Sequence, residues 1–127
     1  MKPPIRTVLI AEDNPDARES LATFLELLGL EVVAVQDGAQ AVEAARRRLP
    51  EFAILDLGMP LLDGWAACRA IRELPGGDAI TIVAFSGWGS AEHRQRSQAA
   101  GFDAHWTKPM DAESLLTVLR PAQDPSM

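Results

Sequence analysis

Short apolar runs alternate with longer segments of helical periodicity along the whole chain. The runs cover residues 7–11, 31–35, 52–55, 80–85 and 104–107. The first, third and fourth runs are continuous and rich in branched side chains, without apolar–polar alternation, which is typical of strands buried on both faces of a parallel sheet. The last run is the weakest, and its place in the alternation is what identifies it as a strand.

Each run is followed by a segment with the signals of a helix. The first segment has Asn14 as an N-cap, Pro15 at the first helical position, an apolar stripe that includes Phe24 and Leu28, and Gly29 at its end. Further helices are expected near residues 38–49, 63–74, 90–101 and 111–120. Five strand–helix units in strict order predict a doubly wound parallel α/β sheet with right-handed crossovers.

The fourth predicted helix differs from the others because it is almost entirely polar. Little apolar burial is expected to anchor it, so it is either an ordinary well-solvated face or an element that a bound ligand could shift. His93 in this helix is expected to face solvent. Trp65 in the third helix, together with Cys68, is expected to pack in the core.

Length and composition restrict the class of protein. A chain of 127 residues is expected to form one domain, residues 1–127, with a core over about 5–120 and a frayed C-terminal tail. The single cysteine, Cys68, excludes an internal disulfide and favours a reducing compartment, so we expect a cytoplasmic protein. No apolar run is long enough to span a membrane. The net charge of -6 argues against nucleic-acid binding.

Polar side chains follow the predicted strands at their carboxyl ends, where open parallel sheets bind ligands. They are Glu12, Asp13, Asp56, Ser86 and Lys108. Neighbouring carboxylates about 4 Å apart repel by about 4 kcal/mol at an effective dielectric constant of about 20, so three of them require a cation. All-oxygen ligands favour Mg²⁺, while a lysine and a hydroxyl suit a phosphoryl group. A carboxylate among these groups is suited to attack phosphorus and become an acyl phosphate.

Each of these residues has an ordinary explanation when taken alone. Asp13 could be an acid at a helix start, Asp56 could begin a turn, and Lys108 could be a solvated side chain. Their joint placement at four strand ends favours a functional site.

Four segments then carry a resemblance to a known family, the receiver domain of two-component response regulators. The matching segments are residues 8–14, residues 55–60 with 63–64, residues 84–87 and residues 107–109. The resemblance covers essentially the whole chain and implies a flavodoxin-like fold, with a five-stranded sheet of order 2-1-3-4-5 flanked by five helices. Receivers of hybrid sensor kinases look most similar, although we expect a free-standing domain.

The resemblance also implies a role for each site residue. Asp56 would be the phospho-acceptor, and Glu12, Asp13 and the Gly58 backbone carbonyl would hold Mg²⁺ with it. Ser86 would be the switch hydroxyl and Lys108 would pair with the phosphoryl group. The implied partners are a histidine kinase or histidine phosphotransfer protein and a downstream protein target, with the chain a monomer or a weak phosphorylation-dependent dimer. Such a domain catalyses only its own phosphorylation and dephosphorylation and is not an enzyme on external substrates.

Three positions depart from the common family pattern. Glu12 stands where many members have Asp, and Ser86 replaces the commoner Thr. His105 stands where many members carry Tyr or Phe as the second switch residue. We therefore expect the switch to run mainly through Ser86 and the loop of residues 87–89.

Two other functions share part of this set of residues or this fold. A phosphatase of the haloacid-dehalogenase type also uses Asp, Ser, Lys and Mg²⁺, but it needs a D-x-D motif after the first strand, where this chain has Glu12-Asp13-Asn14. A pseudo-receiver would bind a partner without phosphorylation, and the intact set of site residues argues against it.

Overall fold

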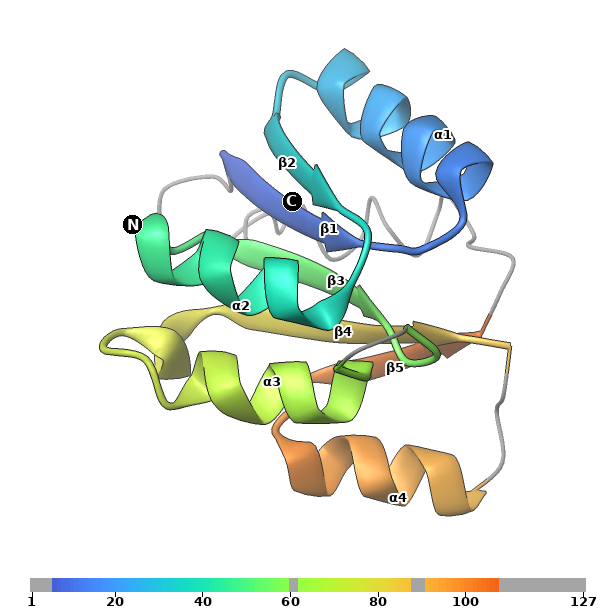
Figure 1. Cartoon of the computed structure of the whole chain (residues 1–127), viewed down its shortest axis with the longest axis vertical. Coiled ribbons are helices and arrows are strands. Elements are labelled where there is room, and N and C mark those ends of the chain that lie inside the picture. Colours follow the sequence, from blue (N-terminus) through green and yellow to red (C-terminus); the bar gives the residue numbers. More distant parts are fainter. Residues whose placement is uncertain (1–5, 60–61, 88–90, 108–127) are drawn as a thin grey trace, which may run out of the picture.

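The chain folds around a five-stranded parallel sheet (Figure 1). The computed structural model describes residues 6–59, 62–87 and 91–107. The strands are β1 (Thr7–Ala11), β2 (Glu31–Val35), β3 (Phe52–Asp56), β4 (Thr81–Ser86) and β5 (Ala104–Thr107), in the order β2-β1-β3-β4-β5. All neighbouring pairs are parallel. The predicted sheet and its strand order are confirmed.

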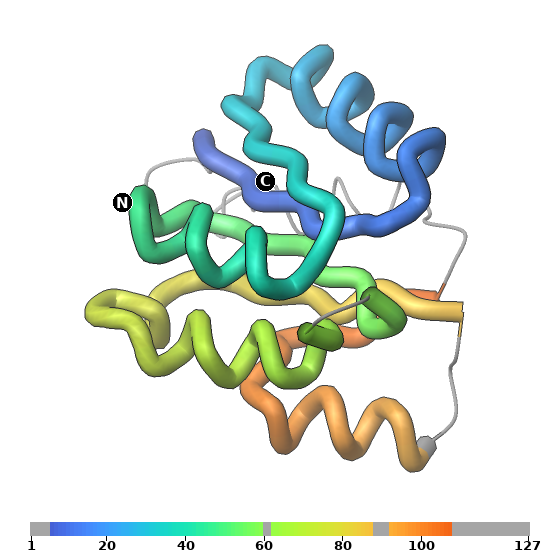
Figure 2. Tube along the Cα trace, viewed as in Figure 1, coloured from blue at the N-terminus to red at the C-terminus, as the bar shows by residue number. Residues whose placement is uncertain are grey.

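Helices connect the strands in the predicted alternation, which the trace in Figure 2 follows. They are α1 (Pro15–Leu27), α2 (Gly38–Arg47), α3 (Gly64–Arg72) and α4 (Ala91–Ala100), with the 3₁₀ turn η1 (Gly77–Ala79) before β4. The fifth predicted helix, beginning near Asp111, lies outside the described residues. Among the helices that are described, none combines the length and apolar character that a membrane crossing requires.

Different helices cover the two faces of the sheet. α1 packs on one face, where Leu25 joins a buried cluster with side chains of β1, β3 and β4. α2, α3 and α4 lie side by side on the other face (Figure 1), over a larger cluster that includes Trp65, Cys68 and Ala100. β1, β3 and β4 are buried almost throughout, while β2 is at an edge and largely exposed. The continuous apolar runs are therefore the strands covered on both faces.

Side-chain caps set the beginnings of the first three helices. Asn14 Oδ1 accepts a hydrogen bond from the Ala17 amide at 3.0 Å, and Asp37 and Asp63 cap α2 and α3 in the same way. These caps satisfy amide groups that have no partner inside the helix, which is why the chain turns helical at these points. The predicted apolar stripe of α1 is wrong at its end, because Leu28 follows the helix and is 44% exposed.

The fourth strand is shifted by one residue from its prediction. It begins at Thr81 rather than Ile80 and it includes Ser86 as its last residue. Ser86 is 2% exposed, so the polar residue belongs to the covered end of the strand rather than to the loop that follows.

Arg72 at the end of α3 joins two connections at the opposite end of the sheet, the one before β4 and the one before β5. Its guanidinium donates to backbone carbonyls on both sides of β4 and to the carboxylate of Asp103, which also accepts from the Ile82 amide. The carbonyl acceptors are those of Gly77, Asp78, Ile80 and Gly101. The Arg72 side chain is only 16% exposed, so a largely buried charge is distributed over several acceptors.

Candidate functional site

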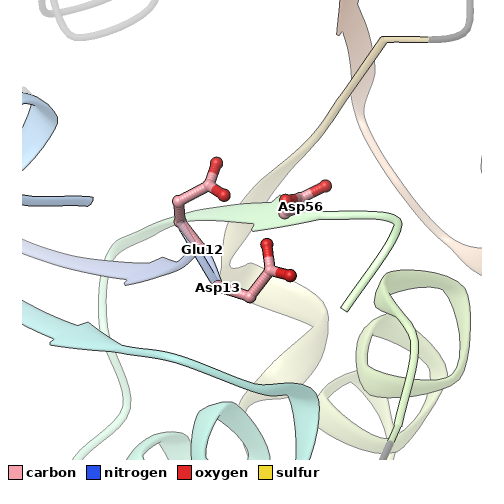
Figure 3. Close-up of side chains that lie close together, drawn as sticks. All are labelled: Glu12, Asp13 and Asp56. Atoms are coloured by element: carbon pink, nitrogen blue, oxygen red, sulfur yellow. The ribbon is translucent and has the colours of Figure 1, made fainter. Parts of the chain in front are cut away.

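Three carboxylates gather at the carboxyl ends of the adjacent strands β1 and β3 (Figure 3). Glu12 and Asp13 directly follow β1, and Asp56 is the last residue of β3. One oxygen from each carboxylate lies within 4.8 Å of an oxygen from each of the other two. The parallel register explains this meeting, because Ala11 pairs with Leu55, and Glu12 and Asp56 are the next residues along these two adjacent strands.

Glu12 is fixed by its own backbone and by the start of α1. Its amide donates to the Val35 carbonyl at 3.1 Å, and its carbonyl accepts from Arg18 Nη1 at 2.9 Å. Its carboxylate Oε2 accepts from the Asn14 amide at 3.0 Å. Glu12 is 2% exposed, so its carboxylate is a buried member of the cluster, and these hydrogen bonds hold it in place. Asp13 is exposed and faces solvent.

Asp56 is 5% exposed and is positioned by the loop that follows it. Its Oδ1 accepts from the Gly58 amide at 3.1 Å, and the next residue, Leu57, donates its amide to the Phe85 carbonyl of β4. α3 begins directly against this turn. A Cβ on Gly64 would lie 2.6 Å from the Asp56 carbonyl oxygen, closer than side chains come in proteins. Only glycine allows the helix to start at this point without moving Asp56.

The donor set of the cluster fits a hard divalent cation. Carboxylate oxygens are the ligands that Mg²⁺ and Ca²⁺ prefer, and both metals can accept water or another oxygen as further ligands. Two of the carboxylates are buried and the third is exposed, so a cation could approach from solvent and keep water on that side. Opposite charge at this point would offset the mutual repulsion of the carboxylates.

Ser86 lies beside this cluster and contacts His105. Ser86 follows Phe85, the register partner of Asp56 on the neighbouring strand. Its Oγ is 3.0 Å from His105 Nε2 of β5. His105 Nδ1 is 3.0 Å from Ser97 Oγ of α4. The two predicted switch residues are therefore brought together, and a serine of α4 joins them.

Two polar roles in α3 and α4 were missed by the sequence analysis. Trp65 packs in the core as predicted, being 5% exposed, but its Nε1 also donates to Ser97 Oγ at 3.0 Å. His93 was predicted to face solvent, and this is wrong, because it stacks on Trp65 with ring centroids 5.8 Å apart. Arg96 places its guanidinium carbon 3.8 Å from the centre of the Trp65 ring. The i, i+3, i+4 spacing of residues 93, 96 and 97 was the available signal.

α4 is thus anchored by polar side chains. Ser97 is 1% exposed and Ala100 is 4% exposed, although the helix has few apolar residues. Packing on the Trp65 ring replaces the apolar stripe that the other helices use. Cys68 is buried as predicted, and Trp106 packs against the cluster on the α1 face.

Lys108 and the loop residues Trp88 and Gly89 lie outside the described residues. The roles predicted for them, and the prediction that the switch runs mainly through residues 87–89, stay predictions. Gly87 is described and is exposed after β4.

Comparison with known proteins places this geometry in a family. The sequence model of the response regulator receiver domain matches residues 8–120. An uncharacterised 14.6 kDa protein of Leptolyngbya boryana is 31% identical over 113 residues, which is 89% of this chain and 86% of the relative. Response regulator MprA of Mycobacterium sp. strain KMS is 34% identical over 117 residues, covering 92% of this chain and 50% of the regulator. The chain therefore spans about half the length of that regulator.

Solved structures agree with the sequence comparison. The receiver domain of sensor histidine kinase PA1611 from Pseudomonas aeruginosa PAO1, which has a magnesium ion coordinated in its active site cleft, superimposes with a TM-score of 0.83 at 32% identity, covering 90% of this chain and 93% of that one. Chemotaxis protein CheY4 of Vibrio cholerae gives a TM-score of 0.85 at 27% identity, over 91% and 96% of the two chains. The sheet order, the acidic cluster and these matches together show that the chain belongs to the response regulator receiver domain family and has its flavodoxin-like fold.

Proposed function

We propose that the chain is a phosphoryl acceptor of a two-component phosphorelay and that Asp56 is the residue modified. The observation that carries this proposal is the place of Asp56 in the acidic cluster, with its carboxylate within 4.8 Å of those of Glu12 and Asp13. Asp56 is nearly buried at this strand end, and an aspartate placed among other carboxylates in this way is typical of a functional site.

The same residues are proposed to hold Mg²⁺, and the similar Pseudomonas receiver, which has a magnesium ion coordinated in its active site cleft, supports the choice of metal. The ligands would be the carboxylates of Glu12, Asp13 and Asp56 and the backbone carbonyl of Gly58. Bound Mg²⁺ supplies positive charge that neutralises the carboxylates and an incoming phosphoryl group.

In the proposed step, an Asp56 carboxylate oxygen attacks the phosphorus of a phosphohistidine on the donor protein. The new oxygen–phosphorus bond forms as the phosphorus–nitrogen bond of the donor breaks, and the electron pair remains on the donor's ring nitrogen. Ser86 is proposed to donate a hydrogen bond from its hydroxyl to a phosphoryl oxygen, and Lys108 to pair with another. The groups that promote the reaction lie on the same domain that becomes modified, so no external substrate is turned over.

The proposed partners are a histidine kinase or histidine phosphotransfer protein as donor and a downstream protein as target. We further propose that residues 1–127 act as one domain in the cytoplasm and remain monomeric or form a weak dimer on phosphorylation. The excess of acidic residues, 18 against 12 basic ones, is consistent with protein partners rather than nucleic acid.

Intact mass spectrometry after incubation with acetyl phosphate tests the acceptor. We expect the protein to gain the mass of one phosphoryl group when Mg²⁺ is present. No gain is expected when EDTA is present during the incubation, and none is expected for Asp56→Asn. Asp63→Asn is a matched control, because Asp63 caps α3 and is not part of the cluster. Absence of any gain with acetyl phosphate, phosphoramidate and a phosphorylated phosphotransfer protein, combined with a flat Mg²⁺ titration of tryptophan fluorescence, would instead favour a pseudo-receiver.

A further inference from the structure

A chain of hydrogen bonds runs from the candidate site into the interface of α3 and α4. It joins Ser86 Oγ to His105 Nε2, His105 Nδ1 to Ser97 Oγ, and Ser97 Oγ to Trp65 Nε1, with 3.0 Å at each step. The four residues come from β4, β5, α4 and α3. Since Ser86 and Ser97 are almost fully buried, each bond lies where water competes little for the partners.

The direction of the proton along this chain follows from its buried end. An indole N–H can only donate, so Ser97 Oγ accepts from Trp65. The Ser97 hydroxyl proton then needs an acceptor, because leaving it without one in a buried position costs free energy. Within the part of the chain that is described, the Ser97 hydroxyl contacts Trp65 and His105, and His105 Nδ1 is the acceptor of the two. The imidazole therefore carries its proton on Nε2.

We propose that His105 and Ser97 are positioning residues that set the direction of the Ser86 hydroxyl. With the proton on Nε2, His105 donates to Ser86 Oγ, and the Ser86 O–H is directed to an acceptor other than His105. Ser86 is one residue beyond the register partner of Asp56, so that acceptor can be a phosphoryl oxygen on Asp56. This inference rests on the proposed function for the identity of the anion.

The opposite tautomer would have the opposite effect. A proton on Nδ1 would leave Nε2 as an acceptor, and the Ser86 hydroxyl proton would turn to His105. Ser86 would then present lone pairs to the anion and repel it. The tautomer of His105 therefore decides whether Ser86 helps or hinders phosphorylation.

The far end of the chain is held in place by packing. Trp65 is stacked on His93 and lies under the Arg96 guanidinium, both from α4. The indole N–H is thereby fixed in a direction that reaches Ser97. A displacement of α4 relative to α3 would move the Trp65 N–H away from Ser97. Through the proton position on His105, this would change the direction of the Ser86 hydroxyl.

The tautomer is measured directly by long-range ¹H–¹⁵N NMR of the imidazole nitrogens in the full chain at pH 8. The chain has two histidines, so the imidazole signals that disappear in His105→Phe are those of His105. We expect Nδ1 of His105 to be unprotonated and Nε2 to be protonated. Ser97→Ala should shift the two nitrogens toward the other tautomer, and Ser97→Thr, which keeps a hydroxyl, should restore them. A wild-type His105 with its proton on Nδ1, or with both nitrogens protonated, overturns the proposal.

The functional consequence is tested by a double-mutant cycle on the rate constant of phosphorylation by acetyl phosphate with saturating Mg²⁺. Ser97→Ala and His105→Phe should each slow the reaction about fivefold, the factor that one ordinary hydrogen bond supplies. The double variant should be no slower than His105→Phe alone, because Ser97 acts through His105. Gln98→Ala, an exposed neighbour on α4, should react at the wild-type rate. If the two substitutions lower the rate constant independently, so that the double variant shows the product of the two factors, Ser97 does not act through His105 and the proposal is refuted.

The two measurements separate this inference from the proposed function. If the wild type is phosphorylated but His105 carries its proton on Nδ1, the positioning role fails and the acceptor role stands. If no phosphorylation occurs, the NMR measurement still decides the proton arrangement, because it requires no phosphoryl donor.

Discussion

Removing the charge of Asp13 should stabilise the metal-free protein, because the acidic cluster is self-repelling. Asp13→Asn preserves the shape of the side chain and removes one negative charge. The cluster oxygens lie within 4.8 Å of one another, which corresponds to about 0.9 kcal/mol per pair in bulk water and about 3.5 kcal/mol at an effective dielectric constant of about 20. Asp13 is exposed, so the lower value applies to its two pairs. Their sum is about 2 kcal/mol, and screening by salt reduces it to about 1 kcal/mol.

Asp13 is the suitable member of the cluster for this test. The Glu12 carboxylate accepts from the Asn14 amide and the Asp56 carboxylate from the Gly58 amide, so substituting either would also remove a hydrogen bond. Asp13 precedes the N-cap of α1, where a negative charge gains a few tenths of a kcal/mol from the helix dipole, and this slightly lowers the expected gain.

Urea unfolding at low salt, with EDTA and then with Mg²⁺, measures the effect. In EDTA at low salt the variant should have a free energy of unfolding about 2 kcal/mol above the wild type, and NaCl at about 0.1 M should reduce the difference to about 1 kcal/mol. Mg²⁺ should raise the free energy of unfolding of the wild type more than that of the variant, because the wild type, with all three carboxylates, is expected to bind the ion more tightly. Asp16→Asn is the matched control, since it removes the same charge from the exposed first turn of α1.

If Asp13→Asn is no more stable than the wild type in EDTA at low salt, the carboxylates do not destabilise one another. A gain in stability that salt leaves unchanged would equally exclude a Coulombic origin, because salt screens interactions between exposed charges. Asp16→Asn should be neutral or slightly destabilising, so the same stabilisation in this control would point to net charge rather than to the cluster.

Three further outcomes follow from the packing around the site and at the far end of the sheet. Gly64→Ala places a Cβ 2.6 Å from the Asp56 carbonyl oxygen, so it should lower the free energy of unfolding in urea by about 1–3 kcal/mol and slow phosphorylation. Gly87→Ala is the control, because Gly87 is exposed and its substitution should leave the free energy of unfolding nearly unchanged. Arg72→Met removes the donors to buried carbonyls and should cost about 3 kcal/mol, against less than about 0.5 kcal/mol for exposed Arg69→Met. Burial raises the pKa of the Cys68 thiol to about 11 from 9.0, so the folded state holds this proton more tightly and the wild type should lose stability relative to Cys68→Ala as pH rises from 9 to 11. A constant difference between these two proteins across that range would contradict the burial argument.

Local signals predicted most of the fold. Branched apolar runs marked the covered strands, and Asn14, Asp37 and Asp63 marked helix starts because each side chain satisfies an amide only three residues away. The acidic cluster was also predictable, since a residue after a parallel strand must lie at one edge of the sheet. These features depend on neighbours in the chain or on strand order alone.

Other features depended on contacts between distant segments. Arg72 donates hydrogen bonds to carbonyls in the connections before β4 and before β5, and no residue spacing in the sequence predicts these partners. The sequence pattern predicts that His93 is a solvated helix residue, but in the folded structure its ring stacks on Trp65 of α3. A polar residue is assigned to solvent by pattern, but its true environment depends on what the neighbouring helix presents.

The sequence by itself determined the alternation of strands and helices, the helix caps and the set of polar residues at the strand ends. These follow from short-range hydrogen bonding and from the periodicity of apolar burial. Only the tertiary structure decided that His105 lies between Ser86 and Ser97, and that Trp65 ends their chain of hydrogen bonds. A side-chain hydrogen bond needs its two atoms within about 3 Å, and that condition is met only when four separate elements have packed against one another.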